Sequence, residues 1–254
     1  MGKIISITNQ KGGVGKTTTA INLSAALAEA NQNVLVIDFD PQANATSGFG
    51  VELSDEDKTV MDVIRGKSDI KKAIIETSVK NLDILAGDVE LSVLELELLD
   101  KPEKEKKLKQ VVDKISSEYD YIVIDCPPSV GMLTVNALVA SDSVIIPVQC
   151  EYFSLEGLTQ VLDIIDLVQQ KMNTKLSVEG ILFTMYDGRT KLAQDVVKNV
   201  KEILNEKTFE TLIPRNVRLA EAPSNGMTIL SYDPSSSGAE SYRKLAAEIL
   251  GQTK

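Results

Sequence analysis

Two lysines and three glycines lie close together near the start of the chain, in Asn9-Gln10-Lys11-Gly12-Gly13-Val14-Gly15-Lys16-Thr17-Thr18. An apolar run, Lys3–Thr8, precedes this segment, and a helical pattern, Thr19–Ala28, follows it. A strand, a glycine-rich loop and a helix in this order direct backbone N–H groups at a phosphate chain, which they bind at the helix N-terminus. The segment therefore predicts a nucleotide site, and its flanks disfavour the alternative of a glycine turn without a ligand. We expect the phosphates to contact Gly12, Gly13, Val14, Gly15, Lys16, Thr17 and Thr18.

This loop departs from the strict P-loop pattern, which has a glycine five residues before the Gly-Lys-Thr triplet. That position is Gln10 here. The remaining glycines still permit a close backbone approach to oxygens, and Lys16 can reach the β- and γ-phosphates. The second lysine, Lys11, stands at the opening of the loop and needs an explanation of its own.

Carboxylates follow two other apolar runs. Asp38 and Asp40 come at the end of Val34–Ile37, and Asp125 comes at the end of Tyr121–Ile124. The chain contains no histidine, so any general base must be a carboxylate, a lysine or water. We predict that Asp40 positions or deprotonates an attacking water, while Asp38 either takes part in the site or caps a turn. The candidate oxygen ligands of Mg²⁺, directly or through water, are Thr17, Asp40 and Asp125.

These residues need a scaffold, and short apolar runs that alternate with helical patterns supply one. Most of the runs are continuous rather than alternating, as in strands that are covered on both faces. We predict one α/β domain over residues 1–254, with a single doubly wound, mostly parallel sheet flanked by helices. The predicted strands are Lys3–Thr8, Asn33–Asp38, Leu82–Ala86, Tyr121–Asp125, Ser143–Val148, Val178–Met185 and Phe209–Ile213. The clearest later helices are Lys101–Ser117, Leu155–Lys171, Leu192–Asn205 and Ala239–Gly251.

In such a sheet, ligands bind outside the carboxyl ends of the strands. The glycine loop, the acids Asp38 and Asp40, and Asp125 each follow a predicted strand, and Pro214 and Asn216 follow the last one. Their shared position at one edge supports a single composite site more strongly than any one motif does.

Composition narrows the function classes. The formal net charge is −10, which argues against a generally basic nucleic-acid binder but allows a local basic patch. Cys126 and Cys150 lack metal-ligand spacing and are expected to be buried, reduced thiols. No signal peptide or transmembrane run is recognisable, so we expect a cytoplasmic protein without membrane attachment.

The loop Lys11-Gly12-Gly13-Val14-Gly15-Lys16-Thr17 resembles the signature of the ParA/MinD family of deviant P-loop ATPases. The resemblance covers essentially the whole chain, and it is strongest to partition ATPases of the ParA/Soj type. The other matching stretches are Asp40–Gly48, Pro147–Gly157 and Ile213–Ser224. It implies an ATP- and Mg²⁺-dependent ATPase that forms a homodimer, with Lys11 reaching the partner's nucleotide much as an arginine finger does.

The same resemblance assigns the nucleoside and DNA contacts. It implies that Pro214 packs on the adenine, with Arg215 beside it, and that Asn216 binds the adenine edge. It also implies that the ATP dimer binds double-stranded DNA without sequence preference through Arg189 and Arg218, and is thereby nucleoid-associated. Lys191, Lys198 and Lys201 could extend this patch or simply be solvated. A ParB-type partner is expected to stimulate slow ATP hydrolysis through a short basic segment.

Three other functions are compatible with such a loop. A MinD-like membrane ATPase would need a basic amphipathic C-terminal helix, but the polar face of 240–254 mixes acids and bases. An iron–sulfur carrier would need suitably placed cysteines. A metabolic ATPase that amidates or carboxylates a small molecule would need a substrate pocket, and no motif indicates one.

Overall fold

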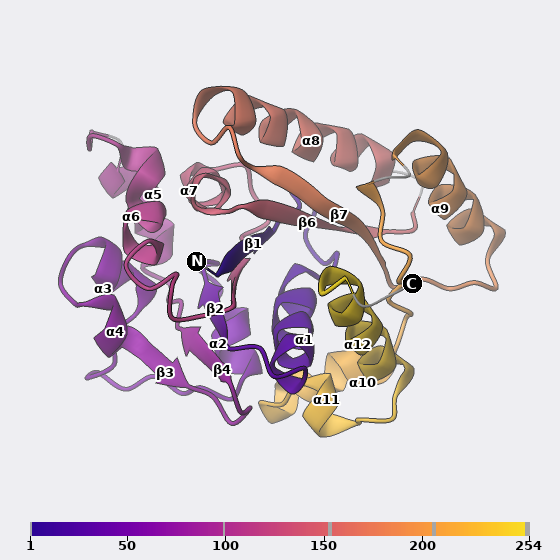
Figure 1. The fold of residues 1–254 in the computed structure, drawn as a ribbon, viewed down its shortest axis with the longest axis horizontal. Coiled ribbons are helices and arrows are strands. Elements are labelled where there is room, and N and C mark those ends of the chain that lie inside the picture. The colour runs from indigo at the N-terminus through magenta and orange to yellow at the C-terminus, as the bar shows by residue number, and fades with distance from the viewer. Residues whose placement is uncertain (1, 99, 152–153, 205–206, 252–254) are drawn as a thin grey trace.

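The computed structural model describes residues 2–98, 100–151, 154–204 and 207–251, and Figure 1 shows their arrangement. The strands are β1 (Lys3–Ile7), β2 (Val34–Asp38), β3 (Ile74–Glu76), β4 (Leu82–Leu85), β5 (Tyr121–Asp125), β6 (Ser143–Gln149) and β7 (Ser177–Thr184). The first helices are α1 (Lys16–Glu29), α2 (Asn44–Gly48), α3 (Val60–Ile64), α4 (Ile70–Ala73), α5 (Leu91–Leu98) and α6 (Lys107–Val112). They are followed by α7 (Met132–Ala140), α8 (Ser154–Lys171), α9 (Lys191–Leu204), α10 (Val217–Glu221), α11 (Ile229–Tyr232) and α12 (Ser237–Ile249).

The strands form one sheet in the order β3-β4-β2-β5-β1-β6-β7. Every neighbouring pair is parallel except β3 and β4, which are antiparallel. The predicted doubly wound, mostly parallel sheet is therefore confirmed. Because β2, β5 and β1 are neighbours, the residues that follow these strands meet at one edge.

Alternate side chains of the central strands face two different helical layers. Ile5 and Val36 belong to a buried cluster with α1, α11 and α12, whereas Ile4 and Leu35 pack with α3, α5, α6 and α7. Beside β6 and β7 lie α8 and α9 (Figure 1), where Phe183 and Val200 belong to a third cluster. Burial on both faces explains why these strands read as continuous apolar runs.

Two of the predicted elements are wrong. Residues 209–213 form no strand; Phe209 and Ile213 donate backbone hydrogen bonds to Ile181 and Phe183 of β7, and only isolated bridges flank the segment. Phe209 and Ile213 are buried against the sheet, so burial produced the strand-like apolar pattern without a continuous ladder. The predicted helix Lys101–Ser117 is reduced to the 3₁₀ turn Lys104–Lys106 and α6.

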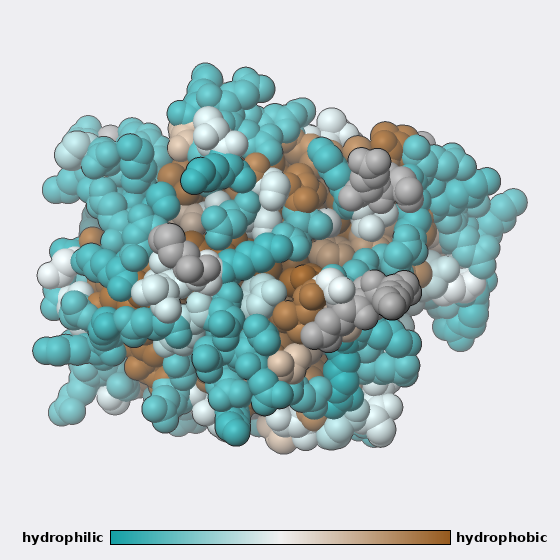
Figure 2. Space-filling view, viewed as in Figure 1, coloured by the Kyte–Doolittle hydropathy of each residue, from teal (hydrophilic) through white to brown (hydrophobic). Residues whose placement is uncertain are grey.

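The surface mixes polar and apolar side chains. The face shown in Figure 2 is mostly hydrophilic, with hydrophobic side chains in small, separate groups. The last helix, α12, packs on α1 through buried Ala239, Tyr242, Leu245 and Ala246, so its apolar stripe is used within the fold. None of the helices in the described part of the chain combines the length and hydropathy needed to span a membrane.

Candidate nucleotide-binding site

The glycine-rich loop connects β1 to α1 and is hydrogen-bonded to the ends of two other strands. The Asn9 amide donates to the carbonyl of Pro147 in β6 (2.7 Å), and the Thr184 hydroxyl of β7 donates to the carbonyl of Val14 (2.8 Å). Gly15 precedes the first turn of α1 with φ +88°, a left-handed conformation that favours glycine. The loop is thus fixed from three strands with the N-terminus of α1 at its end, the arrangement that binds phosphate in other proteins.

The two lysines of the loop have opposite environments. Lys16 is buried, with its Nζ 3.2 Å from the Lys11 carbonyl oxygen. Burial lowers the pKa of Lys16, and the nearby Asp125 carboxylate opposes that shift. The Lys11 ammonium lies at the surface instead and donates to Glu151 Oε2 at 2.6 Å. Only Lys16 is therefore positioned to serve phosphates bound in its own loop.

The sheet register brings the acids of β2 and β5 together. Asp38 pairs with Asp125 across the β2–β5 ladder, and the Phe39 N–H donates to the Asp125 carbonyl. Asp38, Asp40 and Asp125 are all buried. The structure thus confirms that these three carboxylates gather at the carboxyl edge beside Lys16.

Asp125 is the most unusual group of this edge. Both of its carboxylate oxygens are buried, and no group of the described residues meets hydrogen-bond geometry with them, although the Thr17 hydroxyl lies close enough to favour the charged carboxylate. Burial, and then the Asp38 carboxylate, raise its pKa well above the usual range, while the Thr17 hydroxyl and the Lys16 ammonium act in the opposite direction. A buried carboxylate without partners is costly unless something satisfies it. A bound Mg²⁺ with its waters would do so, and the oxygen donors Asp125 and Thr17 fit that ion.

Asp38 and Asp40 accept hydrogen bonds from different residues. The Asp38 carboxylate accepts from the backbone N–H and the hydroxyl of Thr46, both at 2.7 Å, and so holds the start of α2. Burial raises the pKa of Asp38 to about 6. Of the two roles left open for Asp38, this geometry favours the capping one. Asp40 accepts from the Gln42 N–H at 3.0 Å at the beginning of the segment that leads into α2.

A pocket of about 300 Å³ adjoins the loop at Gly15 and Thr18. Pro214, Arg215 and Asn216, the residues expected to contact the nucleoside, line it even though the strand expected before them is absent. Tyr186 forms a bridge with Pro214, which keeps these residues at the end of β7. The pocket is also lined by Thr184, Met185, Ile213, Val217, Leu219, Ala220 and Tyr242.

Comparison with known proteins agrees with this geometry. A family model described as an AAA domain matches residues 2–178. The sporulation initiation inhibitor protein Soj of Bacillus subtilis is 53% identical over 249 residues, covering 98% of each chain. The chromosome-partitioning ATPase Soj of Treponema pallidum is 51% identical over 252 residues, covering 99% of this chain and 98% of its own. The chain belongs to the ParA/Soj family of partition ATPases.

Solved structures share the ParA/MinD fold. MinD of Pyrococcus horikoshii, complexed with Mg-ADP, is 30% identical with a TM-score of 0.80, covering 98% of this chain and 96% of its own. A cobyrinic acid a,c-diamide synthase of Mycobacterium smegmatis with bound ADP and magnesium is 34% identical, with a TM-score of 0.85. That match covers 98% of this chain and 94% of the synthase.

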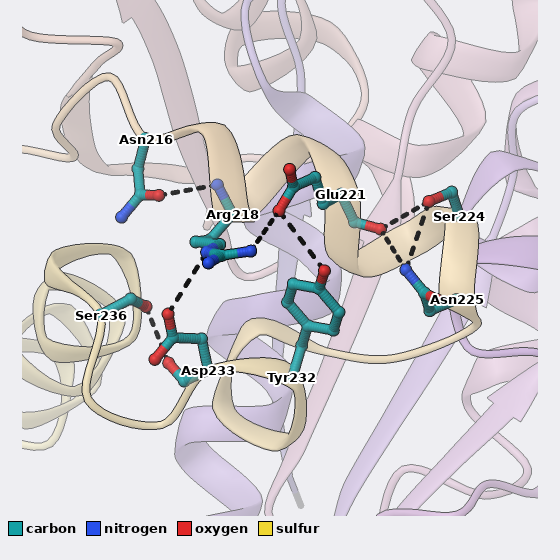
Figure 3. Close-up of polar contacts among 8 residues, drawn as sticks. All are labelled: Asn216, Arg218, Glu221, Ser224, Asn225, Tyr232, Asp233 and Ser236. Atoms are coloured by element: carbon teal, nitrogen blue, oxygen red, sulfur yellow. Dashed lines mark hydrogen bonds and ion pairs between the residues drawn. The ribbon is translucent and has the colours of Figure 1, made fainter.

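The arginines expected to bind DNA in this ParA/Soj member lie on two exposed segments near the pocket. Arg189 is 90% exposed, and its guanidinium donates twice to Asp187, at 2.8 and 2.7 Å. Arg218, on α10, pairs with Glu221 at 2.9 Å and with Asp233 at 3.7 Å (Figure 3). Lys198 and Lys201 pair with Glu202 and Glu210, and of the two only the Lys198 side chain is well exposed. Neither arginine is therefore a free cation in this ParA/Soj structure.

Several site residues of this ParA/Soj member were not predicted. Met185 lines the pocket with φ +50°, and the Gln149 side chain donates to the carbonyl of Gly13 at 2.9 Å. Tyr242 reaches the pocket from α12, more than 200 residues from the loop, with its hydroxyl 3.2 Å from that of Thr19. No local spacing signals such contacts. The position of Gln149 at the carboxyl end of β6 is the one signal that could have identified it.

Of the two cysteines expected to be buried in this ParA/Soj member, only Cys126 is. Both thiols are free, Cys126 is buried and Cys150 is half-buried. Burial raises the pKa of Cys126 and raises that of Cys150 to about 11, so neither is activated as a thiolate ligand. The described residues contain no cluster of three or more His, Cys, Asp or Glu side chains suited to a metal. These features give an iron–sulfur function no support.

Proposed function

We propose that this protein is a Mg²⁺-dependent ATPase that acts as a dimerising switch in DNA segregation. Residues 1–254 act as one ATPase domain. ATP binding assembles a homodimer, the dimer binds double-stranded DNA without sequence preference, and slow hydrolysis returns it to monomers. It is thereby cytoplasmic and nucleoid-associated.

The contrast between Lys11 and Lys16 carries this proposal. A single-subunit nucleotide site needs one buried lysine on its phosphates, and Lys16 meets that need. Lys11 lies at the mouth of the same loop, and its exposed ammonium is paired with Glu151. The phosphates of a nucleotide bound to a second subunit could replace Glu151 as the partner of this ammonium. A cation supplied in trans makes hydrolysis conditional on dimerisation.

The chemistry at the buried edge follows from the acids and the loop. The backbone of Gly12–Thr17 and the Lys16 ammonium bind the phosphates, and Pro214 and Asn216 bind the base in the adjoining pocket. Mg²⁺, when bound, would neutralise negative charge on the phosphates. Thr17 and Asp125 would hold it, and Asp40 would orient the attacking water or take its proton.

DNA and a ParB-type protein are the proposed partners. Arg189 and Arg218 provide cations on exposed segments. A dimer presents two copies of this local patch to one duplex, which helps binding although each chain has a net charge of −10. The acidic remainder of the surface suits a short basic segment of the ParB-type partner, which is expected to accelerate hydrolysis.

Measuring the molar mass with ATP and Mg²⁺, with and without duplex DNA of random sequence, tests the proposal. We expect a monomer with ADP, a dimer with ATP, and retention of only the dimer on DNA. A protein that hydrolyses ATP as a monomer would contradict the trans role of Lys11.

A metabolic ATPase is the second candidate, favoured by the similarity to the structure named as a cobyrinic acid a,c-diamide synthase. It predicts turnover that depends on a small-molecule acid and an amide donor rather than on DNA and a ParB-type protein. Steady-state hydrolysis measured with each pair distinguishes the two functions.

A further inference from the structure

Arg218 is paired with acidic side chains from two segments. Figure 3 shows its guanidinium between Glu221 of its own helix and Asp233, which follows α11. The Nη1–Oε2 distance to Glu221 is 2.9 Å and the Nε–Oδ2 distance to Asp233 is 3.7 Å. The hydroxyl of Tyr232 donates to the same Glu221 oxygen at 3.4 Å. The cation is thus matched by two carboxylates before any nucleic acid approaches.

The carboxylates occupy the position that a DNA phosphate would need. A phosphate binds arginine through the same planar donors that a carboxylate engages. The Arg218 side chain is 54% exposed, so a phosphate can reach it, but it must displace or share with Glu221 and Asp233. Two negative charges beside the guanidinium also repel the DNA backbone at short range.

The helix that carries Arg218 and Glu221 also forms part of the wall of the pocket. Val217, Leu219 and Ala220 of α10 line the pocket, and Arg218 lies among them in sequence on the same five-residue helix. Asn216 begins that helix by accepting from the Arg218 N–H at 2.8 Å, and its amide donates to Ser237 at the start of α12. The backbone of Glu221 is held in turn by Ser224 and Asn225, which both donate to its carbonyl. Glu221 and Asp233 are therefore presented by anchored backbone, not by a loose tail.

We propose that Glu221 and Asp233 act as intramolecular competitors of DNA phosphate for Arg218 and thereby limit the affinity of the ATP dimer for DNA. This inference rests on the proposed DNA-binding function. A switch that must leave DNA after each turnover needs a DNA contact that is weak enough to break. By competing for Arg218, the two acids would keep its contact with DNA weak.

Retention on a random-sequence duplex, measured with a non-hydrolysable ATP analogue over a range of salt concentrations, tests the competition. Glu221→Gln and Asp233→Asn should each strengthen DNA binding, and the double variant should do so by about three- to tenfold. If the released Arg218 neutralises one further DNA phosphate, the dependence of log affinity on log salt should steepen by ~0.9 for that phosphate.

Two controls separate this effect from a general change of charge. Glu103→Gln removes an exposed acid from a similar i,i+3 pair with Lys106, and it should leave retention nearly unchanged. In an Arg218→Ala background, Glu221→Gln should lose most of its effect, because the cation for which it competes is absent.

The outcomes distinguish the inference from the function on which it rests. If the unmodified dimer is not retained on DNA, the proposed function fails. If it is retained but Glu221→Gln behaves like Glu103→Gln, or strengthens binding equally without Arg218, the competition is overturned. Thermal unfolding of each variant shows whether a lost fold accounts for weaker binding.

Discussion

The buried phosphate edge and the exposed rim around it are built differently. At the edge, Lys16, Asp38 and Asp125 are buried and fixed by strand register and loop backbone. At the rim, Lys11, Arg189 and Arg218 are exposed, and each is paired with an acid of the same chain. Groups that serve a ligand within one subunit are thus preorganised, whereas groups proposed to serve a partner are held by replaceable ion pairs. Exposed pairs of this kind are screened by solvent and contribute little to stability, so exchanging them costs little.

Asp40→Ala has the largest expected effect and probes the edge. If Asp40 orients or deprotonates the attacking water, hydrolysis should fall by ~10²–10⁴-fold while ATP binding is retained, trapping the ATP dimer. Single-turnover hydrolysis and molar mass with ATP measure the two consequences. Normal hydrolysis in this variant would remove Asp40 from the reaction.

Substituting the two lysines separately tests the comparison directly. Lys16→Ala removes the buried ammonium from the phosphates and should weaken ATP binding at least ~100-fold. Lys11→Ala is the matched control, and it should leave the ATP affinity of the monomer within ~3-fold but impair dimerisation and hydrolysis. Titration calorimetry with ATP measures the affinities. Equal losses of affinity would mean that both lysines serve the same nucleotide.

Arg189→Glu tests whether the rim binds DNA. Charge reversal at a side chain that is 90% exposed should weaken DNA retention by ~10-fold or more without preventing ATP-dependent dimerisation. Lys198→Glu is the control on the exposed face of α9. If Arg189→Glu retains DNA normally, the patch lies elsewhere.

The sequence predicted the edge better than the rim, for a physical reason. The glycine loop, Asp125 and the parallel sheet follow from local spacing and from the rule that strand ends share an edge. Glu151 and Asp233 give no such signal, because their pairing with a lysine or arginine far along the chain depends on how loops fold back. Glu221 is different, since it follows Arg218 by three residues on one helix, a spacing at which side chains meet. The predicted strand Phe209–Ile213 was wrong for a related reason, since an apolar run records burial, and the hydrogen bonds of a ladder leave no mark in composition.

The raised pKa of buried Asp38 should make the stability of the fold depend on pH. Its pKa in the fold, about 6, lies above the ordinary value of 3.8, so the folded protein binds more protons than the unfolded chain between these values. The stability that Asp38 contributes is therefore fully present below pH 3.8 and is lost as the pH rises through about 6. Relative to Asp38→Asn, the Mg²⁺-free protein should lose ~1 kcal/mol or more of unfolding free energy across this window. Urea unfolding of both proteins at several pH values measures the difference, and a difference independent of pH would contradict the raised pKa.

Glu151→Gln has the smallest expected effect and tests how replaceable the rim pairs are. Removing the carboxylate frees Lys11 from an exposed pair worth ~0.2–1 kcal/mol, so ATP-dependent dimerisation should become at most ~5-fold more favourable. Sedimentation over a range of protein concentrations measures the dimer dissociation constant, and Asp113→Asn, which releases Lys109 from a similar exposed pair, is the matched control. A large loss of dimerisation in Glu151→Gln would show that Glu151 contacts the second subunit and does more than hold Lys11. The rim would then contain a preorganised interaction of its own, and the contrast with the buried edge would no longer hold at this position.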